Sequence, residues 1–489
     1  MTLFAHHRDD LQRVAHRALR ERGLLDAFDG PALEQLDGIR GPSQESGADI
    51  RDLRGLPWCS IDNDESKDLD QLSVALDGGD GSVRIFVAIA DVDSLVDKGT
   101  PIDGHAAQNT ASVYVAGHVY PMLPEKLSTD LTSLGQGVDR LSLVVEYVVR
   151  AEGSLAESEV SRALVRNHAK LTYNAVADWL DGHGPLPEAA ASVQGMDAQI
   201  RLQDAVAGRL RELRHQKGAL DFASLEARPV FKDDAVVGMR AEKPNRAKWL
   251  IEEFMIAGNG VAARFLEAKG RPSLRRVVRS PERWAKIVDV AAKLGESLPG
   301  QPSARALEAF LAKRRAADPL RFPDLSLVIV KLMGAGEYVA ELPGDLHVGH
   351  FGLSVKDYTH ATAPNRRFSD LVTQRLLKAA LGDQPSPYGI AELKAIAGHC
   401  TVQEGNISKV ERQVHKSAAV LLLEKRVGES FDGLVTGAAD KGTWVRILDP
   451  PAEGRLVQGA QGLLVGDKVR VTLVSTDFER GFLDFVRAR

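Results

Sequence analysis

The acidic segment from Ser60 to Leu72, S-I-D-N-D-E-S-K-D-L-D-Q-L, contains residues that could bind a metal ion. Its acidic residues are Asp62, Asp64, Glu65, Asp68 and Asp70. Like charges this close together need full hydration or a cation, and hard oxygen ligands at irregular spacing suit Mg²⁺ or Mn²⁺. The segment lacks the glycine and the closing glutamate of an EF-hand loop. A solvated acidic loop without a metal is the alternative that these residues alone leave open.

Two adjacent arginines, Arg366 and Arg367, follow a proline turn at residues 363–365. A guanidinium presents a planar fork of donors that can hold a phosphate through two hydrogen bonds. Either arginine could instead form an ion pair with Asp370 at the start of a helix. Hydrolysis of a phosphodiester needs a metal to polarise the phosphate and a cation to hold the developing charge. The acidic segment and this turn could supply those two parts.

Cysteines, histidines and glycines do not form a competing site. Cys59 and Cys400 are far apart and match no metal-binding spacing, which indicates a reducing compartment without disulfides. His347 and His350 are not followed by further ligands, so a zinc site is disfavoured. The glycines of 334–336 lack the lysine of a P-loop, and we therefore expect no nucleotide cofactor.

The chain has 489 residues, too many for one hydrophobic core, and we expect two to four domains. A formal net charge of −5 disfavours a basic coat protein, but it is compatible with a nucleic-acid enzyme that has a local basic channel. The N-terminus has no apolar signal core, and no apolar run approaches about 18 residues. We expect a cytoplasmic monomer without a membrane partner.

Residues 1–49 predict a small helical module. The apolar residues of 6–22 share one helical face, and a second short helix is expected at 31–36. The glycine- and serine-containing segment 41–49 is typical of a linker. A helix-turn-helix-like arrangement is one interpretation, and its wing would require strand residues from 46–56.

The remaining chain predicts an α+β protein with two further domains. In residues 50–427, the apolar, β-branched runs 83–92 and 141–149 predict strands of a mixed α/β domain. From 428 to 489, short strands separated by glycines predict a five-stranded β-barrel of the OB type. Long helices are expected over 247–269, 368–381 and 404–426.

Further sequence blocks follow the acidic segment in a fixed order. They are V-A-I-A-D-V (87–92), T-A-S-V-Y-V (110–115), P-M-L-P-E-K-L-S (121–128), D-R-L-S (139–142), A-K-L-T-Y (169–173), G-A-L-D-F (218–222), L-I-E-E-F-M-I-A-G-N (250–259), H-F-G-L (350–353), A-P-N-R-R-F-S-D-L (363–371) and V-E-R-Q-V (410–414). In this order and spacing, residues 50–427 resemble the RNB catalytic domain of the ribonuclease II / ribonuclease R family of 3′→5′ exoribonucleases. The C-terminal barrel resembles the S-one-type RNA-binding domain that closes those proteins.

The resemblance implies a metal-dependent 3′→5′ exoribonuclease that hydrolyses single-stranded RNA to 5′-mononucleotides and leaves a short end product. RNA with a free 3′ end would be the partner, and Mg²⁺ or Mn²⁺ the cofactor. Asp68, Asp70 and Arg366 match catalytic positions of the family, and Asp70 matches the carboxylate most directly tied to activating the attacking water. The implied metal ligands are Asp62, Asp68, Asp70 and Gln71.

The resemblance also implies positions that bind RNA. Base stacking on aromatic side chains contributes roughly 1–3 kcal/mol per base and tolerates any sequence, which suits an enzyme that moves along RNA. Each aromatic residue could instead fill a core, and each glutamate could form a structural salt bridge. In the barrel, the face of the strand that carries the tryptophan is undetermined. The predicted RNA-binding residues are Tyr114, Tyr173, Phe222, Glu252, Glu411, Arg367 and Trp444.

The chain departs from the family pattern in two places. Two cold-shock domains usually precede the RNB domain, whereas the residues before position 50 are predicted to be helical here. A shorter entrance would bring the RNA channel closer to structured RNA. The family's acidic motif usually ends D-x-D-D, whereas this one ends in Gln71, whose amide can bind a metal only without charge. Gln71 therefore supports an alternative function, a catalytically weak RNA-binding or regulatory protein that retains the fold.

Overall fold

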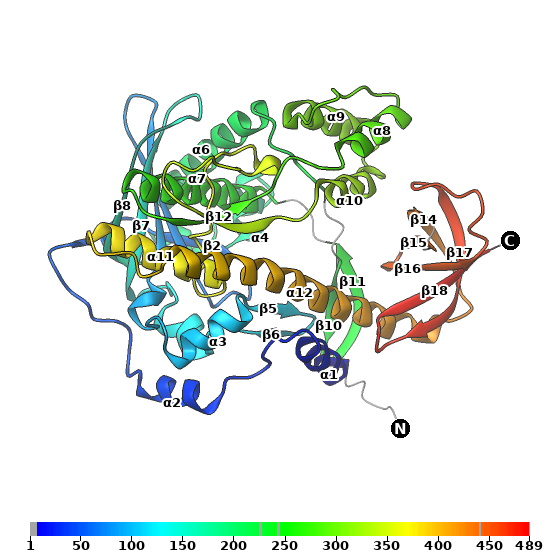
Figure 1. Ribbon diagram of the computed structural model, residues 1–489, viewed down its shortest axis with the longest axis horizontal. Coiled ribbons are helices and arrows are strands. Elements are labelled where there is room, and N and C mark those ends of the chain that lie inside the picture. Colours follow the sequence, from blue (N-terminus) through cyan, green and yellow to red (C-terminus); the bar gives the residue numbers. More distant parts are fainter. Residues whose placement is uncertain (1–6, 224–226, 242–244, 440–441, 489) are drawn as a thin grey trace.

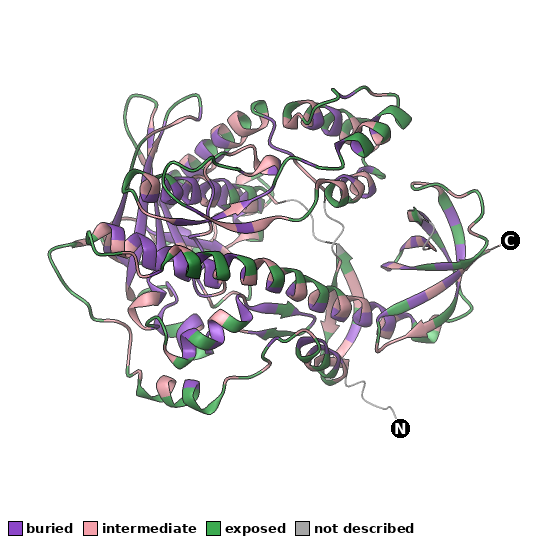
Figure 2. Cartoon of the chain, viewed as in Figure 1, coloured by how far each residue is buried: buried purple, intermediate pink, exposed green. Residues whose placement is uncertain are grey.

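The computed structural model describes residues 7–223, 227–241, 245–439 and 442–488 (Figure 1). A mixed β-sheet with helices packed on it forms the body of the molecule, and a closed β-barrel follows at the C-terminal end. Figure 2 shows that the buried residues concentrate in the sheet and on the inner faces of its helices. The predicted α+β class is confirmed.

The main sheet has seven strands in the order β1-β8-β7-β4-β3-β2-β9. Neighbours from β8 to β2 run antiparallel, whereas β1 is parallel to β8 and β9 is parallel to β2. Nearly every residue of β4 is buried, which explains its unbroken apolar sequence. The strands are β1 (Ile50–Asp52), β2 (Cys59–Asp62), β3 (Gln71–Asp77), β4 (Val83–Ala90), β7 (Asp139–Val149), β8 (Leu155–Arg166) and β9 (Ala169–Thr172).

Helices α6 and α7 pack on this sheet, α6 against β3 and α7 against β7 and β8. Helix α12 crosses the molecule toward the barrel and contacts α1, β5 and β13 on the way (Figure 1). It begins well before the predicted start at 404, whereas the other two long helices match their predicted ranges. The helices around the sheet are α3 (Pro101–Asn109), α4 (Tyr173–Leu180), α5 (Glu188–Ala191), α6 (Met196–Gln216), α7 (Arg246–Ala268), α11 (Phe368–Leu381) and α12 (Ile390–Leu423).

A smaller cluster of three helices has its own core, in which Trp284, Phe310 and Phe322 are buried. Its helices are α8 (Trp284–Lys293), α9 (Ala304–Ala317) and α10 (Phe322–Met333). Three two-stranded sheets pair β5 (Val113–Val115) with β6 (His118–Tyr120), β10 (Ala227–Lys232) with β11 (Ala235–Ala241), and β12 (Ser273–Val277) with β13 (Glu337–Glu341). The short helices are η1 (Val92–Ser94), η2 (Lys126–Leu131), η3 (Phe351–Leu353) and η4 (Glu424–Arg426).

The two N-terminal helices, α1 (His7–Arg20) and α2 (Gly30–Gly38), pack on different parts of the body. The apolar face of α1, which includes Leu11, Val14 and Leu19, is buried in a core shared with α12. Helix α2 packs instead on α3. Residues 50–52 join the main sheet beside β8. In place of a helix-turn-helix with a wing, the chain therefore has two separate helices and an edge strand of the main sheet.

The C-terminal barrel closes in the order β14-β15-β16-β18-β17, which confirms the predicted five-stranded barrel. Phe431, Val445 and Phe485 are buried in its core. Among the described helices, none is long and apolar enough to cross a lipid bilayer. The strands are β14 (Ser430–Ala439), β15 (Gly442–Leu448), β16 (Pro451–Gln458), β17 (Lys468–Asp477) and β18 (Phe482–Arg487).

The barrel contacts several elements of the body, among them α1, β11, α12 and α10. On α12, the Ser417 hydroxyl donates to the Phe478 carbonyl at 2.7 Å. On α10, Arg446 Nη1 of the barrel lies 2.9 Å from Oδ1 of Asp324, a side chain that is only 4% exposed. Burial raises the pKa of Asp324, and the Arg446 guanidinium opposes that shift. The ion pair therefore allows a carboxylate to be buried where the barrel meets the helical cluster.

Arg446→Ala is expected to lower the free energy of unfolding by about 2–4 kcal/mol, because it leaves the buried Asp324 carboxylate without its partner. The matched control is Arg470→Ala, which breaks the exposed pair between Arg470 and Asp432 on the same barrel and should change stability by about 0–1 kcal/mol. Urea denaturation measures both variants. Equal destabilisation by the two substitutions would contradict a role for the buried pair in attaching the barrel.

Candidate active site

The acidic segment and the proline turn meet at one end of the main sheet. Asp70 immediately precedes β3, and its carbonyl accepts a hydrogen bond from the Ala90 amide at the end of β4. Its carboxylate oxygens both contact the turn: Oδ1 accepts from the Asn365 amide at 2.9 Å, and Oδ2 accepts from Arg366 Nε at 3.2 Å. The two halves of the predicted site, which are far apart in the sequence, thus form one contact.

Asp70 is almost completely enclosed, with 2% of its surface exposed. Burial raises the pKa of its carboxyl to about 7, although Arg366 and the Asn365 amide act in the opposite direction. The Arg366 side chain is 42% exposed, and within the described residues its only hydrogen bond to Asp70 uses Nε. The two terminal nitrogens of its guanidinium can therefore bind an anion while Nε holds the carboxylate.

Asp62 and Asp68 lie close to this contact, and Gln71 directly follows Asp70 in the chain. Asp62 is the last residue of β2, and burial raises the pKa of its carboxyl. Asp68 is half-buried, and its Oδ2 accepts from the Tyr114 hydroxyl at 3.2 Å. Gln71 is the first residue of β3 and pairs with Ile89 of β4, so its backbone lies at the same end of the sheet as Asp70.

Tyr114 connects the acidic segment to α12. It lies in the short strand β5, where its ring is 39% exposed and its amide donates to Glu411 Oε1 at 3.0 Å. The same strand reaches the proline turn, because the Ser112 amide donates to the Arg366 carbonyl at 3.0 Å. The predicted residues Tyr114, Glu411 and Arg366 are thus brought together around an aromatic ring that solvent can reach.

Tyr173 lies on the other side of the acidic segment, at the start of α4. Burial raises the pKa of its hydroxyl, and the Asp62 carboxylate acts in the same direction. The neighbouring Asn174 donates to Asp64 Oδ2 at 3.1 Å, and Lys248 Nζ lies 5.7 Å from the centre of the Tyr173 ring. An aromatic ring and a cation therefore border the acidic segment here.

Phe222 and Glu252 lie apart from this group. Phe222 packs on the core of the three-helix cluster. Glu252 is exposed on α7, and the buried carboxylate of that helix belongs to its neighbour Glu253, which accepts from Arg214 Nε at 2.9 Å. A structural salt bridge, the alternative role considered for the predicted glutamates, is formed on this helix by Glu253, whose side chain points in a direction about 100° from that of Glu252.

Arg367 is engaged within the protein. Its Nε and Nη2 donate to the Asp370 carboxylate at 2.8 and 2.7 Å, and Asp370 is completely buried. Asp370 Oδ1 also accepts from the Ala363 amide at 2.8 Å. The helix-start ion pair with Asp370, which was open for both arginines, therefore forms at Arg367 and leaves Arg366 free to face Asp70.

Asn365 belongs to the site, although its residue type offered no chemical reason to predict this. It is 1% exposed, and its Oδ1 accepts from the Thr132 hydroxyl at 2.6 Å. Its side-chain Nδ2 is buried without a hydrogen-bond partner among the described residues. The only signal was its position inside the proline turn at residues 363–365, since a backbone amide that binds a carboxylate does not constrain the residue type.

On the barrel, Trp444 occupies the outer face of β15, half-buried between the core residues Thr443 and Val445 in sequence. It covers Gly437, where a Cβ atom would lie 3.3 Å from the Trp444 ring. Phe431, another aromatic residue of the barrel, is a core residue. Lys441 lies outside the described residues. Of these two residues, Trp444 is therefore the one outside the core, and Phe482 on β18 is a further exposed aromatic of the barrel, at 55%.

The carboxylates of the site fit a hydrated magnesium ion better than a preformed cage. Among the described residues, no group of three or more His, Cys, Asp or Glu side chains is arranged to hold a metal. Asp68 nevertheless lies near enough to Asp62 and Asp70 to raise the pKa of both, although burial is the larger cause. Mg²⁺ typically binds through one or two carboxylates, several waters and phosphate oxygens. The donor set has this chemistry.

Comparison with known proteins finds two matching family models. Residues 50–383 match the RNB domain, and residues 429–488 match the C-terminal S1 domain of RNase II-type exonucleases. Ribonuclease R of Escherichia coli is 30% identical over 507 aligned positions, which cover 96% of this chain and 61% of that protein. Ribonuclease R of Thermotoga maritima is 29% identical, with 89% and 64% covered. The chain thus spans about 61% of the length of the first of these curated relatives.

Solved structures share the fold. The apo form of Mycoplasma genitalium RNase R superposes with a TM-score of 0.88 at 21% identity, covering 98% of this chain and 78% of that one. Yeast Ssd1, described as a pseudonuclease, gives a TM-score of 0.71 at 17% identity, covering 95% and 58%. The same architecture therefore occurs in a protein named as a ribonuclease and in one described as a pseudonuclease.

Asp70→Asn is expected to stabilise the protein in the presence of a chelator. The folded-state pKa of Asp70, about 7, lies above the unfolded value of about 3.9, so ionised Asp70 destabilises the fold once the pH exceeds 4 and most fully above 7. At pH 8 the variant should gain up to about 4 kcal/mol in the free energy of unfolding, because the two pKa values differ by about 3 units, and the gain should shrink as the pH falls from 7 toward 4.

Thermal unfolding at pH 5 and pH 8 measures this difference. Glu65→Gln removes an exposed carboxylate from the same segment and should leave stability nearly unchanged at both values. If Asp70→Asn is less stable than the parent protein at pH 8, the ionised carboxylate of Asp70 does not destabilise the fold, and the raised pKa is contradicted.

Proposed function

Because the chain belongs to the RNB family, we propose that it is a metal-dependent 3′→5′ exoribonuclease that hydrolyses RNA to 5′-mononucleotides. The observation that carries this proposal is the contact between Asp70 and Arg366, with Asp62, Asp68 and Tyr114 around it. A buried carboxylate beside a partly free guanidinium combines a proton acceptor with a phosphate-binding group. Phosphodiester hydrolysis requires both.

In this proposal Arg366 binds the scissile phosphate through its terminal nitrogens while Nε keeps its hydrogen bond to Asp70. In the metal-free protein burial raises the pKa of Asp70 to about 7, and a divalent ion bound to this carboxylate would lower that pKa and keep Asp70 ionised. Asp62, Asp68, Asp70 and the Gln71 amide would hold the divalent ion. When bound, that ion supplies charge neutralisation at the phosphate and makes a bound water more acidic.

RNA is the proposed substrate class. The M. genitalium RNase R structures include complexes with ribose-methylated single-stranded RNA and with double-stranded RNA, which supports single-stranded and structured RNA as candidates for this chain. Tyr114 presents an exposed ring beside Asp68, suited to stacking on the terminal bases. Glu411 positions that ring by accepting from the Tyr114 amide. The free 3′ end and the short end product are proposed from the membership in the RNB family.

The second candidate is a catalytically weak RNA-binding or regulatory protein. Gln71 favours it, because an amide in place of a carboxylate lowers the charge available for a divalent ion. The fold is compatible with it as well, since yeast Ssd1 is described as a pseudonuclease. The same RNA assay distinguishes the two candidates.

Hydrolysis of a 5′-labelled single-stranded RNA in Mg²⁺ and in Mn²⁺ tests the proposal. The parent protein should produce a ladder that shortens from the 3′ end, and Asp70→Asn should slow this by about 10²–10⁴-fold while RNA binding is retained. Gln71→Asp should lower the metal concentration needed for half-maximal rate. RNA that stays intact with both metals while still bound by the parent protein would instead support the second candidate.

Tyr114→Ala should lengthen the end product and weaken binding of short oligonucleotides by about 5–100-fold, because one stacking platform of roughly 1–3 kcal/mol is lost. Tyr114→Phe is the matched control: it keeps the ring, loses the hydrogen bond to Asp68, and should leave the product length unchanged. Gel analysis of the limit products decides between them. An identical limit product for Tyr114→Ala would exclude Tyr114 from the clamp on the terminal nucleotides.

A further inference from the structure

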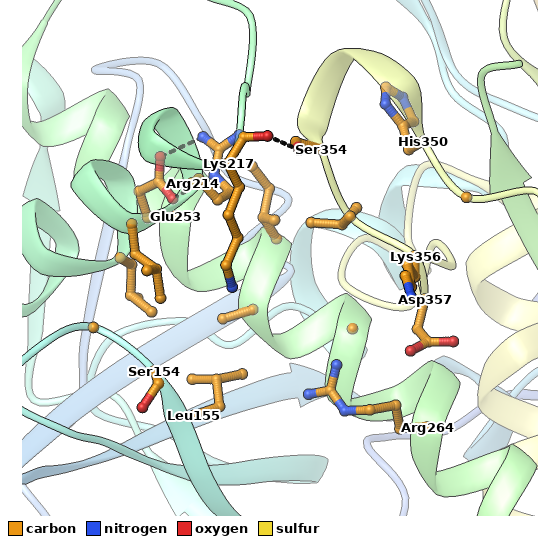
Figure 3. A pocket seen from close by; sticks show the side chains of 18 of the residues that line it. Ser154, Leu155, Arg214, Lys217, Glu253, Arg264, His350, Ser354, Lys356 and Asp357 are labelled. Atoms are coloured by element: carbon orange, nitrogen blue, oxygen red, sulfur yellow. Dashed lines mark hydrogen bonds and ion pairs between the residues drawn. The ribbon is translucent and has the colours of Figure 1, made fainter. Parts of the chain in front are cut away.

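A cavity of about 800 Å³ lies between α6, α7, the turn that joins β7 to β8, and residues 348–357 (Figure 3). It is separate from the site around Asp70. Gln71 pairs with Ile89 of β4, which in turn pairs with Leu143 of β7. The cavity is bordered by Leu155, which pairs with Val149 at the other end of β7. At about 3.3 Å per residue, the strand between Leu143 and Val149 spans roughly 20 Å.

The two carboxylates that line the cavity are already committed to cations. Glu253 accepts from Arg214 through both of its oxygens, with the Nε contact at 2.9 Å. Asp357 Oδ1 lies 3.7 Å from Nη1 of the buried Arg275 and 3.8 Å from Nε2 of His347. Glu253 is therefore fully engaged by Arg214, whereas Asp357 also acts on Arg264, but only as a more distant charge.

Three further cations line the cavity: Lys217 at the end of α6, Arg264 on α7 and Lys356. Within the described ranges their side chains form no ion pair at 4.0 Å or less. Figure 3 shows the Lys217 ammonium and the Arg264 guanidinium pointing into the same space. Burial lowers the pKa of Arg264, and Asp357 opposes this only as a more distant charge. Uncompensated cations around one cavity, in a chain of net charge −5, provide a binding position for an anion.

The remaining wall is largely apolar. Such surface can hold a flat ring system, and the volume lies within the range of about 300–1,000 Å³ that is typical of small-molecule sites. His350 is at the wall too, and burial lowers its pKa to about 4, so it is a neutral hydrogen-bonding group at pH 7. The apolar lining residues are Leu155, Leu210, Leu213, Ile256, Val348 and Phe351.

We propose that this cavity binds a nucleoside 5′-monophosphate, with the phosphate between Lys217, Arg264 and Lys356 and the base against the apolar wall. A phosphate monoester carries a charge of about −1.5 to −2 at pH 7. This negative charge can balance most of the positive charge of the three side chains, which the carboxylates of the cavity do not neutralise. The site does not depend on the proposed hydrolysis of RNA, because binding of a free nucleotide requires no turnover.

Isothermal titration of the full chain with AMP, adenosine and inorganic phosphate, in a chelator, tests the assignment. AMP should bind, adenosine should show no binding, and phosphate should bind at least about tenfold more weakly than AMP. The triple variant Lys217→Gln, Arg264→Gln, Lys356→Gln should lose at least about tenfold in AMP affinity. The charge-matched control, Lys286→Gln, Lys293→Gln, Lys394→Gln, changes exposed lysines outside the cavity and should bind AMP as the parent does.

Three outcomes overturn the proposal. AMP binding that is equal in the triple variant and the parent places the nucleotide elsewhere, including the site around Asp70. Phosphate that binds as tightly as AMP reduces the cavity to a general anion site. A parent protein that does not bind AMP removes the ligand altogether. Lys217→Glu alone, a charge reversal at an exposed residue, repeats the test if the triple variant fails to fold, and it should also weaken AMP binding.

Discussion

The buried carboxylate of Asp70 is the constraint on which the site depends. Enclosing a charge is unfavourable unless hydrogen bonds and an opposite charge replace the lost water. Here the replacement comes from a turn nearly 300 residues away, through the Asn365 amide and Arg366 Nε. The compensation is incomplete, since the pKa of Asp70 is still raised to about 7. The main sheet and the proline turn must therefore be held in register for this contact to exist at all.

The second buried ion pair provides that register. Asp370 receives two hydrogen bonds from Arg367 and one from the Ala363 amide, so it closes the turn on itself. Arg367 is the N-cap residue of α11, and from there its side chain reaches Asp370, three positions further along the helix. Arg366, one position earlier, points the other way. Two identical residue types thus have different roles, one structural and one facing the site, because both precede α11 and the extended backbone at Arg367 directs successive side chains to different sides.

The sequence was sufficient for features that depend on pattern. Apolar runs located β4 and β7, and helical periodicity located α7 and α11, because burial of one or both faces leaves a repeat in residue type. The sequence was insufficient for features that depend on which element packs against which. The helical face of α1 was predicted, but α12 as its partner was not, and the sequence could not choose between Glu252 and Glu253 on a helix that is buried around most of its circumference.

The residue that departs from the family pattern also fits the electrostatics of the site. Asp62, Asp68 and Asp70 already lie within repelling distance, and the pKa of Asp70 is raised even with Arg366 against it. A fourth carboxylate at position 71 would add to that repulsion in the metal-free protein. The neutral Gln71 amide avoids this repulsion, but it offers a divalent ion no negative charge. Under the proposed function, such a site gains much of its metal affinity from the phosphate of bound RNA, so metal and substrate should bind cooperatively.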